Sequence, residues 1–309
     1  HESRGLGDVY KRQDQSDNDK ILFQFVSHVC SKIEIDKVYF IHITKSLEWP
    51  PEIIDKYPDC LAPLDENIQH MIQEQISTNL AIDLIPDSEI LVLDGNPEEV
   101  LLKEVNIKEI DLLVMGKKPL VQGTGRTARR MANLAQCSVA LISSSFQKAL
   151  KSEFAMMVSV DFNESSLNAT KMAEMIRSAN NAKMLLHHAY SVPSGYHYSG
   201  KSFDEFAEIM KKNALDKMLK LVDKAKLNPD KYKQIYTLDK KNNTAKNIGE
   251  TAEKEKVHLI VVGSKGRTKP ASILLGSTAE HLVTNTDLNI LIIKDKKSNL
   301  DLLSYLTDL

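Results

Sequence analysis

Short apolar runs alternate with amphipathic segments along almost the whole chain, and this order most constrains its fold. The runs have strand length and many β-branched residues, whereas the segments between them repeat apolar residues at helical spacing. Strands joined through helices run parallel and are covered by helices on both faces. The sequence therefore predicts an α/β fold built on open parallel sheets. The expected strands are 38–43, 89–93, 111–115, 138–142, 154–160, 184–189, 234–238, 258–262 and 289–293, and the expected helices are 21–33, 65–80, from 97 onward, 127–135, 166–178, 203–226, 244–254 and 277–284.

The same order occurs twice. The offset is 147 residues for Asp14 and Asp161 and for Gly116 and Gly263, and it is 151 residues for Gly125 and Gly276 and for Ile142 and Ile293. The phase change of four lies between Gly116 and Gly125, which indicates that a loop of the first copy lacks four residues. Chance agreement of spacings is the alternative. We interpret the chain as two tandem copies of one domain.

The first 13 residues, HESRGLGDVYKRQ, look foreign to the chain that follows. DVYKRQ resembles the translation of a transposase adaptor, so we expect residues 1–13 to be a non-native leader, with an ordinary flexible basic terminus as the alternative. On this reading the first strand of the first domain is missing or replaced. We expect domains at 14–146 and 153–296, followed by an apolar-rich tail at 297–309 that docks on the body or mediates self-association.

The composition indicates a protein with its own core and no strong charge. Hydrophobic residues make up 42% of the chain and charged residues 27%, and the formal net charge is −2. This balance gives no general attraction to nucleic acid or to an anionic membrane, and no apolar run approaches the roughly 20 residues of a membrane span. The three cysteines, Cys30, Cys60 and Cys137, form no metal-binding spacing. A cytoplasmic location with free thiols is the expectation.

The segment from Val257 to Ile293 contains the clearest candidate site. A strand is followed by Gly263 and Gly266, and after an insertion Gly276 and Ser277 open a helix. This loop leaves the carboxyl edge of a parallel sheet, where glycine amides and a helix N-terminus can hold a phosphate. Positive charge at the loop comes from Lys265, Arg267 and Lys269. Two structural alternatives remain open: a simple turn at the glycines, and a capping box between Ser277 and Glu280.

The order Gly263-Ser264-Lys265-Gly266, nine residues, Gly276-Ser277 resembles the nucleotide-binding motif of the universal stress protein family. An Asp that ends the first strand of a domain, here Asp161, belongs to the same pattern. The resemblance implies a Rossmann-like domain of five parallel strands, with domains that pair through their last strands, here internally or in a homodimer. It also implies ATP or a related adenine nucleotide as the ligand. By position, the binding residues would be Asp161, Gly263, Gly266, Gly276 and Ser277, with Ser264 and Arg267 as neighbours.

Both halves depart from the family pattern. In the second half, Phe162 is bulky where members often have a small residue, and 239–243 replaces a Gly-x-Pro turn. In the first half, Pro119 stands in place of Gly266 and Arg126 in place of Ser277. Proline has no N–H to give to a phosphate, so we expect no family-like ATP binding there. The segment 123–126 is then a tight turn or a small anion nest.

Other chemistry finds little support in the sequence. His187 and His188 are neighbours on a strand and point to opposite faces, so with His197 they are expected to be core or surface residues rather than metal ligands. Asp161 and Glu164 are the acidic residues that could hold Mg²⁺ near the phosphates. We identify no catalytic set.

The resulting hypothesis is a stress-response sensor or regulator that binds one adenine nucleotide, ATP with or without Mg²⁺, in its second domain. Occupancy would alter a surface that is read by a regulatory protein partner of unknown identity. Nucleotide binding without efficient turnover is expected. A slow ATPase or phosphotransfer enzyme and a nucleotide-free assembly scaffold are the alternatives.

Overall fold

A computed structural model describes residues 5–10, 17–30, 33, 35–44, 64–80, 88–117, 125–264 and 275–294. Its strands form one ten-stranded sheet in the order β3-β2-β1-β4-β5-β10-β9-β6-β7-β8. The first five strands of this order come from the first half of the chain and the last five from the second half. Each half is therefore a five-stranded parallel α/β unit, as the repeat and the family resemblance predict.

The elements follow the predicted alternation in both halves. The first half contains β1 (Gly5–Tyr10), α1 (Asp17–Cys30), β2 (Lys37–Thr44), α3 (Leu64–Asn79), β3 (Ser88–Asp94), α4 (Pro97–Ile107), β4 (Leu112–Gly116), α5 (Arg126–Leu134) and β5 (Ser138–Ile142). The 3₁₀ helix η4 (Ser144–Lys151) leads into the second half. The second half contains β6 (Ala155–Ser159), α6 (Glu164–Asn180), β7 (Lys183–Tyr190), η5 (Tyr196–Ser199), α7 (Phe203–Lys224), η6 (Pro229–Lys231), β8 (Tyr232–Leu238), α8 (Thr244–Lys254), β9 (Leu259–Gly263), α9 (Ser277–Asn285) and β10 (Asn289–Ile293).

The two halves meet through their last strands. β5 and β10 pair antiparallel, with Ala140 opposite Leu291, and they are the only antiparallel neighbours within the described sheet. The side chain of Asn289 adds a bridge, because its Oδ1 accepts from the amide of Ser143 at 2.8 Å and its Nδ2 donates to the carbonyl of His258 at 2.7 Å. Internal pairing of the domains, which the resemblance implies, is thus present in the structure.

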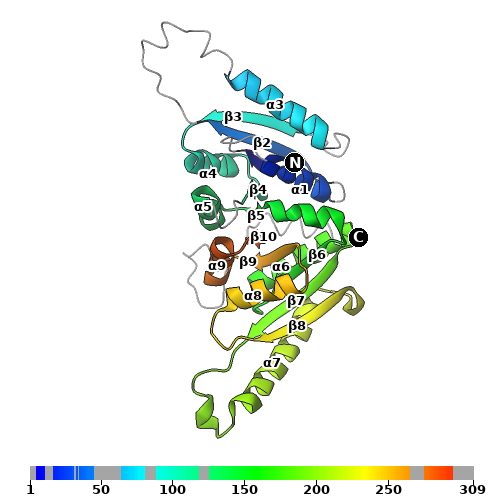
Figure 1. Cartoon of the computed structure of the whole chain (residues 1–309), viewed down its shortest axis with the longest axis vertical. Coiled ribbons are helices and arrows are strands. Elements are labelled where there is room, and N and C mark those ends of the chain that lie inside the picture. Colours follow the sequence, from blue (N-terminus) through cyan, green and yellow to red (C-terminus); the bar gives the residue numbers. More distant parts are fainter. Residues whose placement is uncertain are drawn as a thin grey trace.

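Helices cover both faces of the shared sheet (Figure 1). On one face α1, α3, η4, α6 and α7 bury a core that includes Phe23, Phe146 and Met218. On the other face α4, α5, α8 and α9 bury a second core that includes Leu101 and Leu282. Each core contains residues from both halves, so the halves share their apolar interior as well as their strand pairing.

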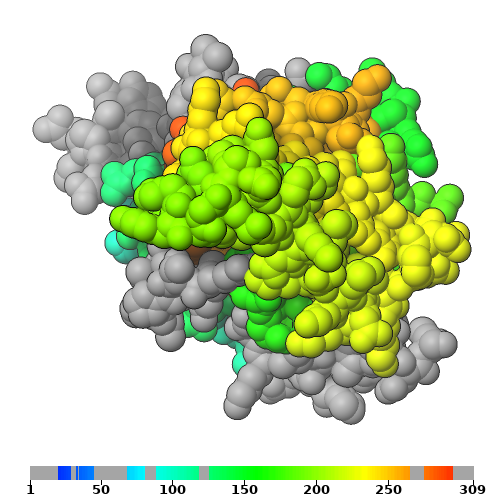
Figure 2. Space-filling model, turned by 90° about the horizontal axis from the view of Figure 1, so that it is seen from below, coloured from blue at the N-terminus to red at the C-terminus, as the bar shows by residue number. Residues whose placement is uncertain are grey.

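The α7 end of the molecule carries exposed apolar side chains. Seen from this end, α7 and the segment that leads into it cross the near face (Figure 2). Leu219 in α7 is 60% exposed and Tyr198 in η5 is 88% exposed. The buried side of α7 holds Ala214 and Met218 against the sheet, which explains why this long helix forms.

β1 (Gly5–Tyr10) occupies the position of the first strand, and it lies in the segment 1–13 that we expected to be a non-native leader. β1 lies between β2 and β4, as β6 lies between β7 and β9. Val9 pairs with Met115 and Ser159 pairs with Val262; Met115 and Val262 are 147 residues apart, but Val9 and Ser159 are 150 apart. The sheet register therefore does not align Asp14 with Asp161 as the repeat predicts. Asp14, and the tail at 297–309, lie outside the described residues.

Candidate functional site at the carboxyl edge of the second half

The two ends of the predicted phosphate loop are tied together. The amide of Gly276 donates to the carbonyl of Ser264 at 2.6 Å, and the amide of Ser264 donates to the carbonyl of Ile293 at 2.9 Å. Ser264 is buried at the end of β9, so Ser264 and Gly276, at the two ends of the predicted loop, meet at the carboxyl edge. Gly266 and Arg267, which belong to the predicted site, lie outside the described residues.

The helix that follows the loop begins at the predicted position. Gly276 is the N-cap of α9 and Ser277 is its first helical residue, with an exposed side chain. The amide of Glu280 donates to the carbonyl of Gly276 at 2.9 Å. The capping-box alternative is wrong, because Ser277 is not the N-cap and the cap has no side-chain hydrogen bond. The first turn of α9 therefore presents main-chain N–H groups and an exposed hydroxyl at this edge.

Gly263 is required by the close approach of α6. A Cβ atom at this position would lie 2.5 Å from Ser165 Oγ and 2.7 and 2.8 Å from the carbonyl carbon and oxygen of Ser165. No side chain fits at these distances without moving the start of α6. The glycine thus has a packing role that neither the phosphate interpretation nor the simple-turn alternative includes.

Asp161 follows β6, beside the end of β9. Its carboxylate accepts from the amide of Asn163 at 3.2 Å and from the side-chain amide of the same residue at 3.0 Å. Asn163 in turn caps α6 by accepting from the amide of Ser166 at 2.7 Å. The carboxylate is therefore oriented by the α6 cap, at the edge where Ser264 and Gly276 meet.

Phe162 adopts a left-handed backbone conformation, with φ of 65°. This conformation is unfavourable for a bulky residue and turns the chain sharply between β6 and α6. Its ring lies 4.3 Å from the ring of His188, centroid to centroid, and His188 Nδ1 is 2.6 Å from the carbonyl oxygen of Val160. An aromatic pair therefore flanks Asp161, where the family pattern often has a small residue.

The segment that replaces the Gly-x-Pro turn is organised by a buried aspartate. The carboxylate of Asp239 accepts from the amides of Lys241 and Asn243, and from the hydroxyl of Thr244 at 3.0 Å. The Asn243 side chain then caps α8 through the amide of Lys246. Side-chain hydrogen bonds therefore stabilise the turn at 239–243, which takes the place of the Gly-x-Pro turn of the family pattern.

His187 is a core residue, as the sequence favours. It is fully buried, its Nε2 lies 2.7 Å from Thr237 Oγ1, and Thr237 also contacts Asn247 Oδ1. Burial, followed by the nearby His188, lowers the pKa of His187 to about 4, against the opposing hydrogen bond to Asn247. His187 is neutral at physiological pH. The described residues contain no group of three or more His, Cys, Asp or Glu that could hold a metal ion.

The equivalent helix of the first half is built differently. Arg126 occupies the place of Ser277, and its guanidinium lies 3.4 Å from Glu98 of α4, which also pairs with Arg130 at 3.0 Å. Glu98 is nearly buried, so the two arginines compensate its charge and join α4 to α5. Gly125 caps the helix without a side-chain hydrogen bond. Pro119 lies outside the described residues.

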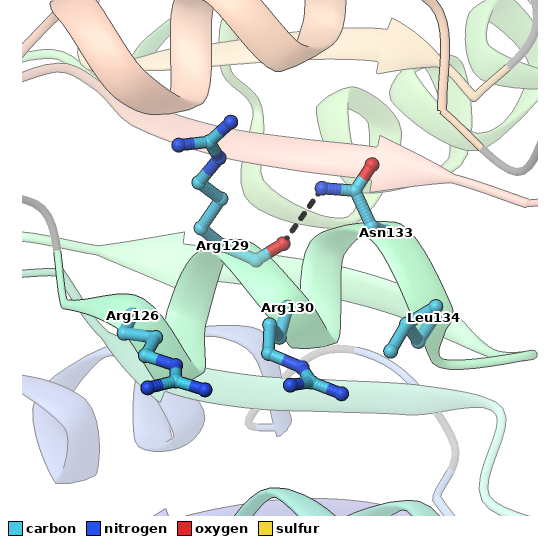
Figure 3. Close-up of a pocket in the computed structure, with 5 residues that line it drawn as sticks. All are labelled: Arg126, Arg129, Arg130, Asn133 and Leu134. Atoms are coloured by element: carbon cyan, nitrogen blue, oxygen red, sulfur yellow. Dashed lines mark hydrogen bonds between the residues drawn. The ribbon is translucent and has the colours of Figure 1, made fainter.

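A third arginine of α5 points to the second half. Arg129 Nη2 lies 3.2 Å from Glu280 Oε1, in the first turn of α9. In Figure 3 the side chain of Arg129 extends away from those of Arg126 and Arg130, and these three arginines line one surface hollow together with Asn133 and Leu134. Sequence reasoning missed this contact, because it exists only once β5 and β10 have paired.

Together, the duplicated parallel sheet and the loop at its carboxyl edge define a tandem α/β protein of the Rossmann-like class. The sequence profile of the universal stress protein family matches residues 13–143 and 155–294. The chain belongs to the universal stress protein family, with two copies of its domain.

One relative agrees with this assignment in sequence, and two solved structures share the fold. A universal stress protein of Methanocaldococcus jannaschii is 30% identical over 147 residues, which are 46% of this chain and 82% of that protein. A universal stress protein structure from Archaeoglobus fulgidus matches 93% of this chain and 98% of its own, with a TM-score of 0.60 at 13% identity. A Pseudomonas aeruginosa structure, described as a putative universal stress protein, matches 99% of this chain and 98% of its own, with a TM-score of 0.60 at 11% identity. These two likenesses concern the fold.

Within the described ranges, no helix combines the length and the apolar character needed to cross a bilayer.

Proposed function

We propose that the second half binds ATP or a related adenine nucleotide, and that the protein acts as a cytoplasmic sensor or regulator in a stress response. The observation that carries the proposal is the hydrogen bond from the Gly276 amide to the Ser264 carbonyl. It closes the loop next to the first turn of α9, at the edge where Asp161 follows β6. Main-chain N–H groups and a carboxylate at one edge suit the phosphates and the nucleoside of one ligand.

The proposed contacts are divided between two ends of the ligand. Ser277 and the loop residues Gly266 and Arg267 would hold phosphate and ribose beside Gly276, whose own amide is bonded to Ser264, and Asp161 would contact the nucleoside. Gly263 and Ser264 would act indirectly, by fixing the start of the loop. Gly263 packs on Ser165, and the carbonyl of Ser264 accepts from the amide of Gly276. The described residues contain no group of three or more His, Cys, Asp or Glu for a metal ion, so Mg²⁺ that enters with ATP would be held mainly by the phosphates.

The proposal is asymmetric, with one site in the chain. In the first half the residue in the place of Ser277 is Arg126, which is engaged with Glu98. Binding in the second half would alter a surface at the carboxyl edge that a regulatory partner reads. The two domains, which we place at 14–146 and 153–296 with β1 completing the sheet of the first, would then have different roles.

Equilibrium titration with ATP tests the proposal directly. We expect saturation at one nucleotide per chain, and loss of binding in the double variant Gly276→Val, Ser277→Ala. Far-ultraviolet circular dichroism controls for folding of the variant. Absence of binding by the unaltered protein, or equal binding by the folded variant, would overturn the proposal. Phosphate release during prolonged incubation with Mg²⁺-ATP would instead favour the slow ATPase, and mass spectrometry of the denatured protein would reveal any nucleotide that it carries.

A further inference from the structure

Glu280 places a negative charge in the first turn of α9. Its carboxylate pairs with Arg129 of α5 at 3.2 Å, and both side chains are partly exposed. A carboxylate in this position is favourable for the helix alone, because it complements the positive end of the helix dipole. It is unfavourable for an anionic ligand at the same end, because like charges repel.

We infer that Arg129, supplied by the first half, is a positioning residue for the nucleotide site of the second half: it offsets the charge of Glu280 and so permits phosphate to approach α9. This inference rests on the proposed function. The geometry that supports it comes from the β5–β10 pairing, which places α5 beside α9. The first half would then contribute to the single site, although its own loop has diverged.

The neighbouring arginines show that the contact is specific within α5. Arg126 and Arg130 both pair with Glu98, inside the first half. Arg129 is the arginine of α5 that pairs with Glu280. Arg126 therefore serves as a matched control: it is on the same helix and carries the same charge, but its carboxylate partner lies in α4. A purely structural role for Arg129 would affect stability without distinguishing charged from uncharged ligands.

The experiment measures binding of ATP, and displacement of ATP by adenosine, for the full chain and the variants Arg129→Gln, Glu280→Gln, their combination, and Arg126→Gln. We expect Arg129→Gln to weaken ATP binding by about threefold to tenfold and adenosine binding by less than about twofold. The loss should shrink at high salt, because it is electrostatic. Adding Glu280→Gln should restore ATP affinity, and Arg126→Gln should leave it near that of the unaltered protein.

The outcomes separate the two proposals. If the unaltered protein binds no ATP, the proposed function fails and the role of Arg129 fails with it. If the unaltered protein binds ATP, three results overturn the role of Arg129 alone. These are unchanged ATP affinity in Arg129→Gln, an equal loss for adenosine and ATP, and failure of Glu280→Gln to restore binding. Urea unfolding of each variant verifies that binding is compared between folded proteins.

Discussion

Lys117 and Lys294 form a reciprocal pair across the two halves. Each is buried, and each donates from Nζ to the last turn of a helix in the opposite half: Lys117 to the carbonyl of Leu282 at 3.3 Å, and Lys294 to the carbonyl of Ala135 at 2.5 Å. Carbonyls at a helix C-terminus lack intrahelical partners and favour a nearby cation. The β5–β10 pairing is thus reinforced by one buried ammonium group from each side.

Replacement of Lys294 by alanine should therefore destabilise the protein. The change removes the donor of the Ala135 carbonyl and leaves a space where the buried stem packs, so we expect a loss of about 1–3 kcal/mol in the free energy of unfolding. Urea denaturation measures it. The exposed Lys148→Ala variant is the control and should change stability by less than about 0.5 kcal/mol. Equal stability of the two variants would contradict a role for the buried lysine at the interface.

The same lysines predict an unusual dependence of stability on alkaline pH. Burial lowers the pKa of Lys117 and of Lys294 to about 8 in the folded state, partly offset for Lys117 by Asp287 and for Lys294 by Cys137. The unfolded chain keeps the ordinary pKa near 10.5, so it binds more protons between about pH 8 and 10.5. The contribution of each lysine to stability should therefore rise with pH in this window.

Comparison with a Lys117→Met variant isolates the effect. The stability of the unaltered protein relative to the variant should increase by about 1–3 kcal/mol between pH 7.5 and pH 10. Burial raises the pKa of Tyr236 to about 12, which acts in the opposite direction above pH 10. This tyrosine is present in both proteins, so its effect cancels in the difference. A difference that is constant with pH would show that the Lys117 ammonium is not desolvated.

Much of the fold could be predicted because its strands and helices are encoded locally. The predicted bounds of Ser138–Ile142, Thr244–Lys254 and Asn289–Ile293 are those observed. β1 could not be predicted, because its identity as a strand depends on its place between β2 and β4 rather than on a periodic pattern. The expectation that the domains pair through their last strands came from the family resemblance, since nothing in the sequences of β5 and β10 specifies their partner, and the structure adds that the pairing is antiparallel.

The parts of the candidate site that a local sequence motif encodes could be predicted, whereas contacts between residues far apart in the sequence could not. The helix start at Gly276-Ser277 follows from the motif. The contact of Gly263 with Ser165 joins residues almost a hundred positions apart, and the ion pair of Arg129 with Glu280 joins the two halves. Such contacts require the packed structure, because propensity and spacing describe only one segment at a time.

Gly263 and Gly249 predict opposite effects of the same substitution. Gly263→Ala places a Cβ atom 2.5–2.8 Å from Ser165, so it should shift α6 and destabilise the protein by about 1–3 kcal/mol. Gly249 lies inside α8, and a Cβ atom there would meet Thr286 Cγ2 at an ordinary 3.7 Å. Gly249→Ala should stabilise by about 0.5–1 kcal/mol, because glycine is unfavourable in a helix interior. Thermal unfolding of both variants measures the signs, and a loss of the same size in each would contradict the packing explanation.

His187 predicts a loss of stability in acid. Its folded pKa of about 4 lies below the ordinary value of 6.5, so the unfolded chain binds one more proton between these pH values. The contribution of His187 is fully present above about pH 6.5 and is lost as the pH falls towards 4, by at most about 1.4 kcal/mol per pH unit. A His187→Asn variant should show a shallower decline of unfolding free energy across this window, even if its stability at pH 7 is lower.

The exposed His197→Gln variant should retain the slope of the unaltered protein. Proton NMR titration of the imidazole resonances gives an independent measurement, and a His187 resonance that titrates near pH 6.5 would refute its neutral, buried state.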